Sequence, residues 1–229
     1  NCGVVALDYK GKKGIATSIG HAPIAALIDP AKGSVLAIGE SLTNIIWAPL
    51  SEGLKSVSLS ANWMWACNNE GEDARLYDAV ESCSDFAIAL GINIPTGKDS
   101  LSMKQEYDNG KVTAPGTVII SAGAPCSDIT KIITPDLKEN GGDLFYLDLS
   151  KSELSLGGSA LGQVVNKIGN ATSTIADAGY FKKVFNSIQK LINENHISAG
   201  HDISSGGLIT TLLEMCFPTQ WAGMDLDLS

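Results

Sequence analysis

Hydrophobic and polar positions alternate with period two in several stretches of the first half of the chain, which is the pattern of half-buried β-strands. The stretches are residues 2–8, 14–19, 56–63, 94–107 and 112–125. Before the last of them, Asn109-Gly110 is a strong hairpin signal. Two other stretches, residues 35–48 and 71–91, carry apolar side chains at helical spacing and end at Pro49 and Gly91. The first half is therefore predicted to be mixed α/β.

The second half shows the same mixture after a polar, turn-rich interval at residues 134–142. We place a domain boundary in this interval, which gives domains at residues 1–138 and 139–229. Strands are predicted at residues 143–150, 197–202 and 224–229, and helices at residues 156–169, 178–194 and 204–217. Because strands alternate with helices, the fold class is α/β or α+β. Both ends of the sequence resemble strands without a polar leader or cap, so we expect a chain cut from a longer one.

Composition limits the classes of function. The 229 residues are 44% hydrophobic, which is enough for a real core. The formal charge of −9, from 25 acidic and 16 basic residues, argues against binding nucleic acid or an anionic membrane surface. No apolar run reaches the ~20 residues that span a bilayer. We therefore predict no nucleic acid and no membrane partner, and an anionic ligand would need local cations or a metal.

The five cysteines, at positions 2, 67, 83, 126 and 216, form no C-x-x-C pair and are odd in number. Such spacing is rare in disulfide frameworks, so we predict reduced thiols and a cytoplasmic protein. No cysteine lies near a histidine and an acid in the sequence, and the three histidines do not pair with cysteines at ligand spacing. Neither a thiol nucleophile nor a zinc site is indicated.

The stretch IPTGKDSLSMK, residues 94–104, combines groups that could bind phosphate. A P-loop requires G-x-x-x-x-G-K-[ST], but the upstream glycine is one residue too far away and an aspartate follows the lysine. What remains is a polar cluster on a strand. Lys98 could neutralise phosphate charge, Asp99 could hold a divalent cation, and Ser100 and Ser102 would share one face.

Glu40 and Asn44 stand at i and i+4 on one predicted helix, so their oxygens point the same way and suit Mg²⁺. The alternative is a solvated pair on an exposed helix face. Asn62 ends a predicted strand beside Trp63 and Trp65, and aromatic residues there are more typical of a core than of base stacking.

The stretch GHDISSGGL, residues 200–208, places His201 and Asp202 before serines and glycines at a helix start. The free N–H groups of such a helix could bind an anion, and the glycines would let phosphate approach the backbone. Alternatively, Ser204 or Ser205 caps the helix and His201 is a packed histidine. The stretch LGGSALGQ has the same build without a carboxylate, and capping alone explains it.

Three separated motifs, GESLTNI, IPTGKDSLSMK and AGHDISSGGLITTLLEM, occur in this order together with LSANWM, GEDARLYDAV and LGGSALGQV. With them the chain resembles the second half of the synthetase region of phosphoribosylformylglycinamidine synthase, also called formylglycinamide ribonucleotide amidotransferase, in its large single-chain form. The resemblance runs over essentially all 229 residues. It implies the fold of the aminoimidazole ribonucleotide synthetase superfamily, with a partial A domain followed by a B domain.

The resemblance also implies a ligase reaction of purine biosynthesis. Formylglycinamide ribonucleotide, ATP and glutamine give formylglycinamidine ribonucleotide, ADP, phosphate and glutamate. The implied cofactors are Mg²⁺ and ATP or ADP, and the implied partners are formylglycinamide ribonucleotide, the first synthetase half and a glutaminase domain. The glutaminase cysteine and the catalytic histidine of the first half are absent from these residues. The chain alone is therefore expected to be inactive, and as a cut-out half it could self-associate.

Site residues carry over from the family position by position. Glu40, Asn44 and Asp202 resemble Mg²⁺ ligands, and Ser204 resembles a nucleotide contact. Asn62, Lys98 and Asp99 match positions that approach ATP and its metal in the small forms of the enzyme. One of Ser100 and Ser102 matches a position that contacts the substrate. We predict nucleotide-binding residues Asn62, Lys98, Asp99, Ser100, Ser204 and Gly206, and metal ligands Glu40, Asn44, Asp99 and Asp202. Where the family usually has a further aspartate ligand, this chain has Asn1, which is a poorer ligand.

Two alternatives remain open. The chain could be a nucleotide-loaded structural module that pairs with the first half without taking part in catalysis. It could also be a kinase-like member of the superfamily, with a small-molecule phosphate acceptor and no glutaminase partner. Exchange of the bound nucleotide with solvent would distinguish the structural module from the catalytic ligase. The sequence on either side of this chain would distinguish the kinase-like protein from the ligase.

Overall fold

A computed structural model covers residues 1–229 and describes all of them except residues 140, 220, 222 and 228–229. Its first part is built on a five-stranded sheet of order β1-β2-β7-β3-β4, in which β3 and β4 are parallel and the other neighbours antiparallel. The strands are β1 (Gly3–Ala6), β2 (Gly14–His21), β3 (Ser58–Met64), β4 (Asn93–Ser100) and β7 (Thr117–Cys126). The strands predicted at residues 2–8, 14–19 and 56–63 are confirmed.

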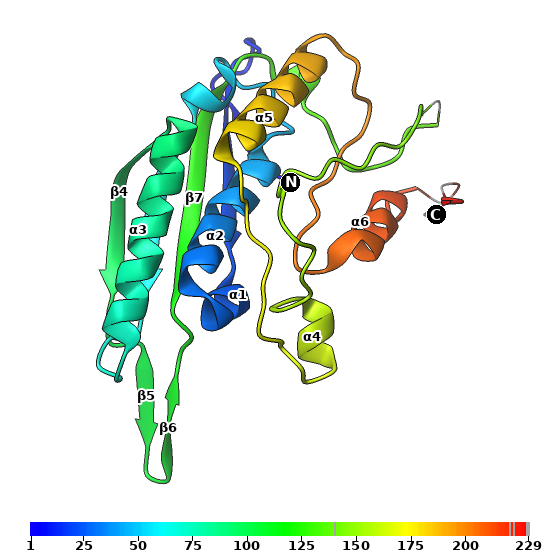
Figure 1. Cartoon of the computed structure of the whole chain (residues 1–229). Helices are drawn as coiled ribbons and strands as arrows, with labels where there is room; N and C mark the ends of the chain where they lie inside the picture. The colour runs from blue at the N-terminus through cyan, green and yellow to red at the C-terminus, as the bar shows by residue number, and fades with distance from the viewer. Residues whose placement is uncertain (140, 220, 222, 228–229) are drawn as a thin grey trace.

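Helices cover one face of this sheet (Figure 1). They are α1 (Pro23–Ile28), α2 (Pro30–Ile45) and α3 (Glu72–Leu90), and a 3-10 turn, η1, spans Gly53–Ser56. Every second residue of β2 is buried, and β7 alternates in the same way, so one face of each strand packs against the helices. Both predicted helices are confirmed. α2 begins earlier than predicted because the Asp29 side chain caps it by accepting from the Lys32 N–H at 3.0 Å.

The two long strands predicted at residues 94–107 and 112–125 are each broken in the structure. β4 ends at Ser100, and a separate antiparallel hairpin of β5 (Lys104–Tyr107) and β6 (Gly110–Thr113) projects from the sheet (Figure 1). Tyr107 pairs with Gly110, so the hairpin loop consists of Asp108 and Asn109. The predicted hairpin is confirmed.

Strands predicted at residues 143–150 and 197–202 are wrong, because both segments are irregular in the structure. Residues 224–227 are irregular too, and the rest of that predicted strand lies outside the described residues. A strand needs a neighbour to pair with its N–H and C=O groups. Apart from one isolated bridge between Leu156 and Thr172, the described residues of the second part offer no such pairing.

The second part contributes the helices α4 (Ala160–Val164), α5 (Ala178–Asn193) and α6 (Gly207–Cys216), and another 3-10 turn, η2 (Ile129–Lys131), precedes it. The predictions for α5 and α6 are confirmed, whereas the stretch at 156–169 gives only the short α4. The Ser159 hydroxyl caps α4 by accepting from the Gly162 N–H at 3.1 Å. The capping interpretation of LGGSALGQ therefore holds.

α5 packs against the first part of the chain, although it follows the polar interval in sequence. It adds four apolar residues to the core formed with α2 and α3, namely Phe181, Phe185, Ile188 and Ile192. Gln189, which is 3% exposed, accepts from the Leu50 N–H at 2.8 Å and donates to the Ile46 and Ala48 carbonyls. The hydrophobic core thus crosses the polar interval, and the domain boundary there stays a prediction.

All five cysteines are free, as predicted. Burial raises the pKa of Cys83 to about 12, which keeps that thiol protonated. In the described part of the chain, no helix is both long enough and apolar enough to cross a membrane.

Candidate functional site

Glu40 and Asn44 lie one turn apart on α2, at the end of β2. Gly20 permits this close approach, because a Cβ added there would collide with the backbone of α2. Glu40 Oε2 accepts a hydrogen bond from the His21 backbone N–H at 3.2 Å. The Asn44 amide donates to the carbonyls of Ile19 at 3.3 Å and Glu40 at 3.0 Å. Its side-chain oxygen accepts no bond from the described residues, so it is open to a ligand.

Gly200 to Asp202 form an irregular segment that passes beside the end of α2. Trp47 packs on Gly200 so closely that a Cβ added there would overlap the indole ring. The Asn1 side-chain amide donates to the Gly200 carbonyl at 3.1 Å. The Asp202 side chain is only 7% exposed. Residues from the start, the first third and the end of the sequence therefore meet at this point.

Glu40 and Asp202 influence one another electrostatically. Burial raises the pKa of Glu40, and the charge of Asp202 raises it further. The hydrogen bond from the His21 N–H and the His21 side chain lower the same pKa. The charge of Asp202 therefore reaches Glu40, and Asn44 lies one helical turn from Glu40 on α2. Two carboxylates in a partly buried place are stabilised by a cation, and carboxylate and amide oxygens suit Mg²⁺.

A metal here would need ligands beyond carboxylates. Within the described ranges of the chain, no group of three or more His, Cys, Asp or Glu side chains is arranged to hold a metal ion. Glu40 and Asp202 supply two carboxylates. Amide, water or phosphate oxygens would therefore have to complete the coordination shell. Mg²⁺ commonly binds in this way, with several waters and a nucleotide.

The start of α6 is not capped by a side chain. Gly206 is the N-cap residue, and α6 begins at Gly207. The alternative in which Ser204 or Ser205 caps the helix is wrong, because no side chain that the structure describes caps this helix start. The two serines bond through their backbone instead: the Ser204 carbonyl accepts from the Gly207 N–H, and the Ser205 carbonyl accepts from the Ala160 N–H, each at 3.0 Å. Because the first N–H groups of a helix have no partner within it, they favour a nearby acceptor.

Lys98 and Ser100 lie on β4, at the edge of the sheet and on the face without helices. Asn62 of β3 is paired with Lys98 in the parallel ladder, so these side chains share that face. Lys98 Nζ donates to Ser100 Oγ at 2.8 Å. Asn62 Oδ1 is buried and has no hydrogen-bond partner among the described residues. A buried acceptor without a donor is unfavourable, so a donor group on a ligand would be stabilised here.

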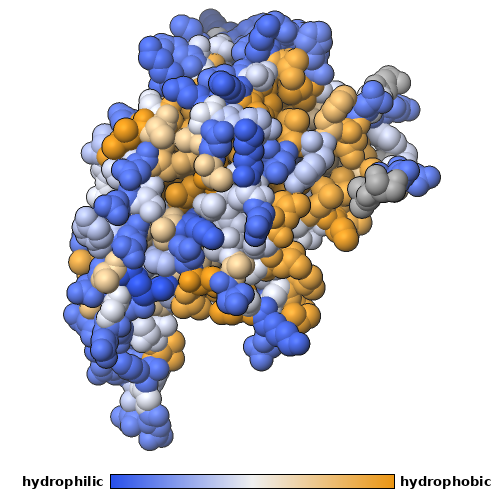
Figure 2. Space-filling view, viewed as in Figure 1, coloured by the Kyte–Doolittle hydropathy of each residue, from blue (hydrophilic) through white to orange (hydrophobic). Residues whose placement is uncertain are grey.

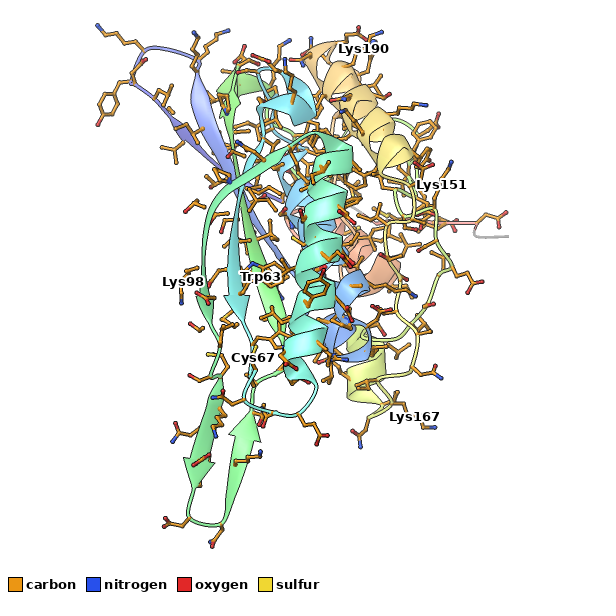
Figure 3. The ribbon with its side chains drawn as sticks, turned by 60° about the vertical axis from the view of Figure 1, so that its left-hand side comes forward. Trp63, Cys67, Lys98, Lys151, Lys167 and Lys190 are labelled. Carbon is orange, nitrogen blue, oxygen red and sulfur yellow. The ribbon has the colours of Figure 1, made fainter. Side chains whose placement is uncertain are left out.

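Asp99 points to the opposite face from Lys98, because successive side chains of a strand alternate. It is paired with Trp63, which packs against the core on the side of α3, whereas Lys98 projects away from α3 (Figure 3). These residues border a shallow pocket of about 330 Å³. β4 lies three strands from β2, roughly 14 Å at the usual spacing. The candidate metal ligands therefore fall in two places, with Asp99 apart from Glu40 and Asp202.

One contact at the site was not predicted. His201 Nδ1 lies 3.2 Å from Asp202 Oδ1, and His201 Nε2 lies 3.0 Å from Glu214 Oε2. Glu214 belongs to α6, 12 positions after Asp202. The adjacency of His201 and Asp202 was visible in the sequence, but no motif singled out Glu214.

Comparisons with known proteins match most of the chain. The family model of the FGAR-AT PurM_N-like domain matches residues 1–125, and that of the AIR synthase related protein, C-terminal domain, matches residues 142–229. The chain is 48% identical over 228 residues to a probable phosphoribosylformylglycinamidine synthase, chloroplastic/mitochondrial, of Arabidopsis thaliana, covering 99% of this chain and 16% of that protein. It is 42% identical over 216 residues to phosphoribosylformylglycinamidine synthase of Homo sapiens, covering 93% and 16%. The chain belongs to the phosphoribosylformylglycinamidine synthase family.

Solved structures related to this synthase family share the fold. Thermotoga maritima PurL complexed with FGAR matches with a TM-score of 0.68 at 14% identity, over 94% of this chain and 33% of that one. The same protein complexed with ATP gives a TM-score of 0.62 at 13% identity, over 94% and 31%. These likenesses show the fold and, together with the AIR synthase related domain matched at residues 142–229, confirm the predicted α/β class of the aminoimidazole ribonucleotide synthetase type. The chain spans 16% of the length of its Arabidopsis and human synthase relatives.

Proposed function

We propose that this chain is part of an ATP-dependent ligase of purine biosynthesis, which converts formylglycinamide ribonucleotide, glutamine and ATP to formylglycinamidine ribonucleotide, glutamate, ADP and phosphate. Membership of the synthase family supports this reaction. The observation that carries the assignment to this chain is that the charge of Asp202 reaches Glu40, which joins oxygen ligands from two separate motifs, Glu40 and Asn44 from one and Asp202 from the other.

In this proposal, Glu40, Asn44 and Asp202 hold Mg²⁺ between α2 and the Gly200–Asp202 segment. The residues fit such an ion, because a cation offsets the repulsion that helps to raise the pKa of Glu40. When bound, Mg²⁺ would neutralise charge on the nucleotide phosphates. Ser204, Gly206 and the first N–H groups of α6 would face those phosphates.

On the sheet, Lys98, Ser100 and Asn62 would contact the nucleotide or the substrate from the face without helices. Lys98 supplies positive charge, and the unpartnered Asn62 oxygen supplies an acceptor. The Asp99 side chain points to the face opposite Lys98. It could therefore hold a metal only if the bound nucleotide extends past the edge of β4 to that face.

The remaining chemistry would come from partners. The first synthetase half and a glutaminase domain would supply the catalytic groups and ammonia, so the chain alone would be inactive. We place the enzyme in the cytoplasm, as the reduced cysteines suggest.

A second candidate function is a nucleotide kept as a structural element. The Asp202 side chain is 7% exposed, so a ligand on it would be largely enclosed. Radiolabelled ADP bound to the full-length enzyme separates the two functions. A structural nucleotide would remain bound through many turnovers, whereas a consumed one would exchange in every cycle.

The test of the catalytic proposal is Lys98→Ala in the full-length enzyme. We expect turnover to fall by about 100-fold or more, the usual effect of removing one group that stabilises developing charge. The unfolding temperature should change little, because Lys98 is exposed. Lys111→Ala is the matched control, since Lys111 is exposed on the projecting hairpin and bonds only Asn69 outside its ladder. Wild-type turnover in Lys98→Ala would refute the role of this strand.

A further inference from the structure

His201 is held between two carboxylates. Its Nδ1 lies 3.2 Å from Asp202 Oδ1 and its Nε2 lies 3.0 Å from Glu214 Oε2, while its side chain is 14% exposed. With a carboxylate oxygen close to each nitrogen, the ring cannot turn about its Cβ–Cγ bond without losing a contact. The position of the ring is therefore fixed by α6, which carries Glu214.

α6 also holds the backbone of the same segment. The Thr211 hydroxyl, on a residue only 6% exposed, donates to the Asp202 carbonyl at 3.1 Å. The helix is itself anchored, because the carbonyl of Met215, 5% exposed, accepts from the Leu137 N–H at 3.1 Å. One helix thus fixes the main chain of Asp202 through Thr211 and its side chain through His201.

The two oxygens of Asp202 have different surroundings. Oδ1 contacts His201 Nδ1 at 3.2 Å. No hydrogen bond from any residue that the structure describes reaches Oδ2. The oxygen left without a partner is the one that a cation, or a water bound to it, could use.

We propose that His201, held by Glu214, is a positioning residue that occupies Oδ1 of Asp202 and leaves Oδ2 for the metal. The inference rests on the proposed metal site and deepens it, by assigning its orientation to a carboxylate–histidine–carboxylate chain that ends on α6. Outer partners of metal ligands act in this way, and their loss typically weakens metal affinity about 10- to 100-fold.

Two substitutions of His201 separate its two contacts. In His201→Asn the amide nitrogen can take the place of Nδ1 and keep the donor to Asp202, but the side chain is too short for Glu214. In His201→Gln the amide reaches the place of Nε2 and keeps the contact to Glu214, while the donor to Asp202 is lost. The experiment measures Mn²⁺ binding to the full-length enzyme with ADP by electron paramagnetic resonance, and the Mn²⁺ lost in Asp202→Asn defines the site.

We expect His201→Gln to bind Mn²⁺ about 10- to 100-fold more weakly than the wild type. His201→Asn should lie between the two, because it keeps the donor to Asp202 but loses the support of Glu214. Glu214→Ala should weaken binding in the same direction, and it replaces His201→Gln if that variant does not fold. The matched control is His196→Gln, because His196 pairs with Glu194 at 3.7 Å in an exposed place at the end of α5, and it should leave binding unchanged.

Equal Mn²⁺ affinity in His201→Asn and His201→Gln would overturn the positioning role, provided that Asp202→Asn loses the ion. If Asp202→Asn and Glu40→Gln both bind Mn²⁺ as the wild type does, the metal site itself is refuted and this inference falls with it. Unfolding temperatures measured without metal exclude a general loss of structure, because a positioning role predicts similar values for the two His201 variants.

Discussion

At the scale of single residues, Gly200 sets the distance between α2 and the segment that carries Asp202. A Cβ at Gly200 would overlap the Trp47 ring, so Gly200→Ala must displace either the segment or the indole. Forcing an atom into a packed place usually destabilises a protein by about 1–3 kcal/mol. We expect that loss in the free energy of unfolding, together with at least about tenfold weaker Mn²⁺ binding, as when a metal ligand loses its support.

Urea unfolding and Mn²⁺ titration check this prediction. Gly123→Ala on β7 is the control, since a Cβ there has no atom within 4 Å. Trp47→Leu should restore part of the loss when combined with Gly200→Ala, because it opens the space that the Cβ needs. Additive effects of the two changes would contradict the packing explanation.

Glu40 gives a prediction for the dependence on pH. Its pKa is raised, mainly by burial and further by Asp202, so folding disfavours the ionised form. The resulting loss of stability is absent below the ordinary pKa of glutamate and is complete once the pH exceeds the raised pKa. Glu40→Gln should therefore raise the unfolding temperature of the metal-free protein at neutral pH, and this gain should disappear in acid. A gain that persists in acid would show a different cause.

Part of the site could be predicted residue by residue from the sequence. The spacing of Glu40 and Asn44 places both on one helix face, and alternation along a strand already separates Lys98 from Asp99. The contact of His201 with Glu214 could not be predicted, because it depends on how α6 folds back on the segment before it. The periodicity of a helix or strand identifies which side chains share a face, whereas contacts between two elements depend on the tertiary fold.

At the scale of elements, the long helices were predicted well and the isolated strands were not. A helix satisfies its own backbone groups, so the pattern in α3 or α5 is sufficient to specify it. A strand depends on a neighbour that the local sequence does not contain. Residues 143–150 alternate as a strand would, yet Phe145 is 77% exposed and the segment has no partner strand among the described residues. The alternation of apolar and polar residues is present in this segment, but no neighbouring strand that the structure describes pairs with it.

Gln189 joins α5 to the end of α2, and its loss should destabilise the whole fold. Gln189→Leu would leave the Leu50 N–H and the Ile46 and Ala48 carbonyls without their partner in a buried place. Since one unsatisfied buried group costs about 1–3 kcal/mol, we expect a loss of about 2–4 kcal/mol in urea unfolding. Gln105→Leu, on the exposed hairpin, is the control. A loss below about 1 kcal/mol would mean that water replaces these hydrogen bonds.

At the scale of the whole molecule, two apolar surfaces lie open. The face of the sheet without helices exposes Val5, Ile15 and Ile19 by 70, 46 and 58%. The second part exposes Val164, Ile209 and Phe217 by 85, 73 and 73%, and apolar residues gather over this part of the molecule in Figure 2. Exposed apolar patches of this kind mark surfaces that another protein surface covers.

The isolated chain should therefore self-associate or lose its ligand. We expect the mass measured by light scattering to rise with protein concentration, because burial of the open sheet face removes apolar surface from water. Ile19→Glu, which puts a charge on that face, should shift the chain toward monomer. Ile88→Glu is the control, since Ile88 is 72% exposed on α3, away from that face. A strict monomer that binds ADP as tightly as the full-length enzyme would contradict the prediction, because neither the sheet face nor the site would then need a partner.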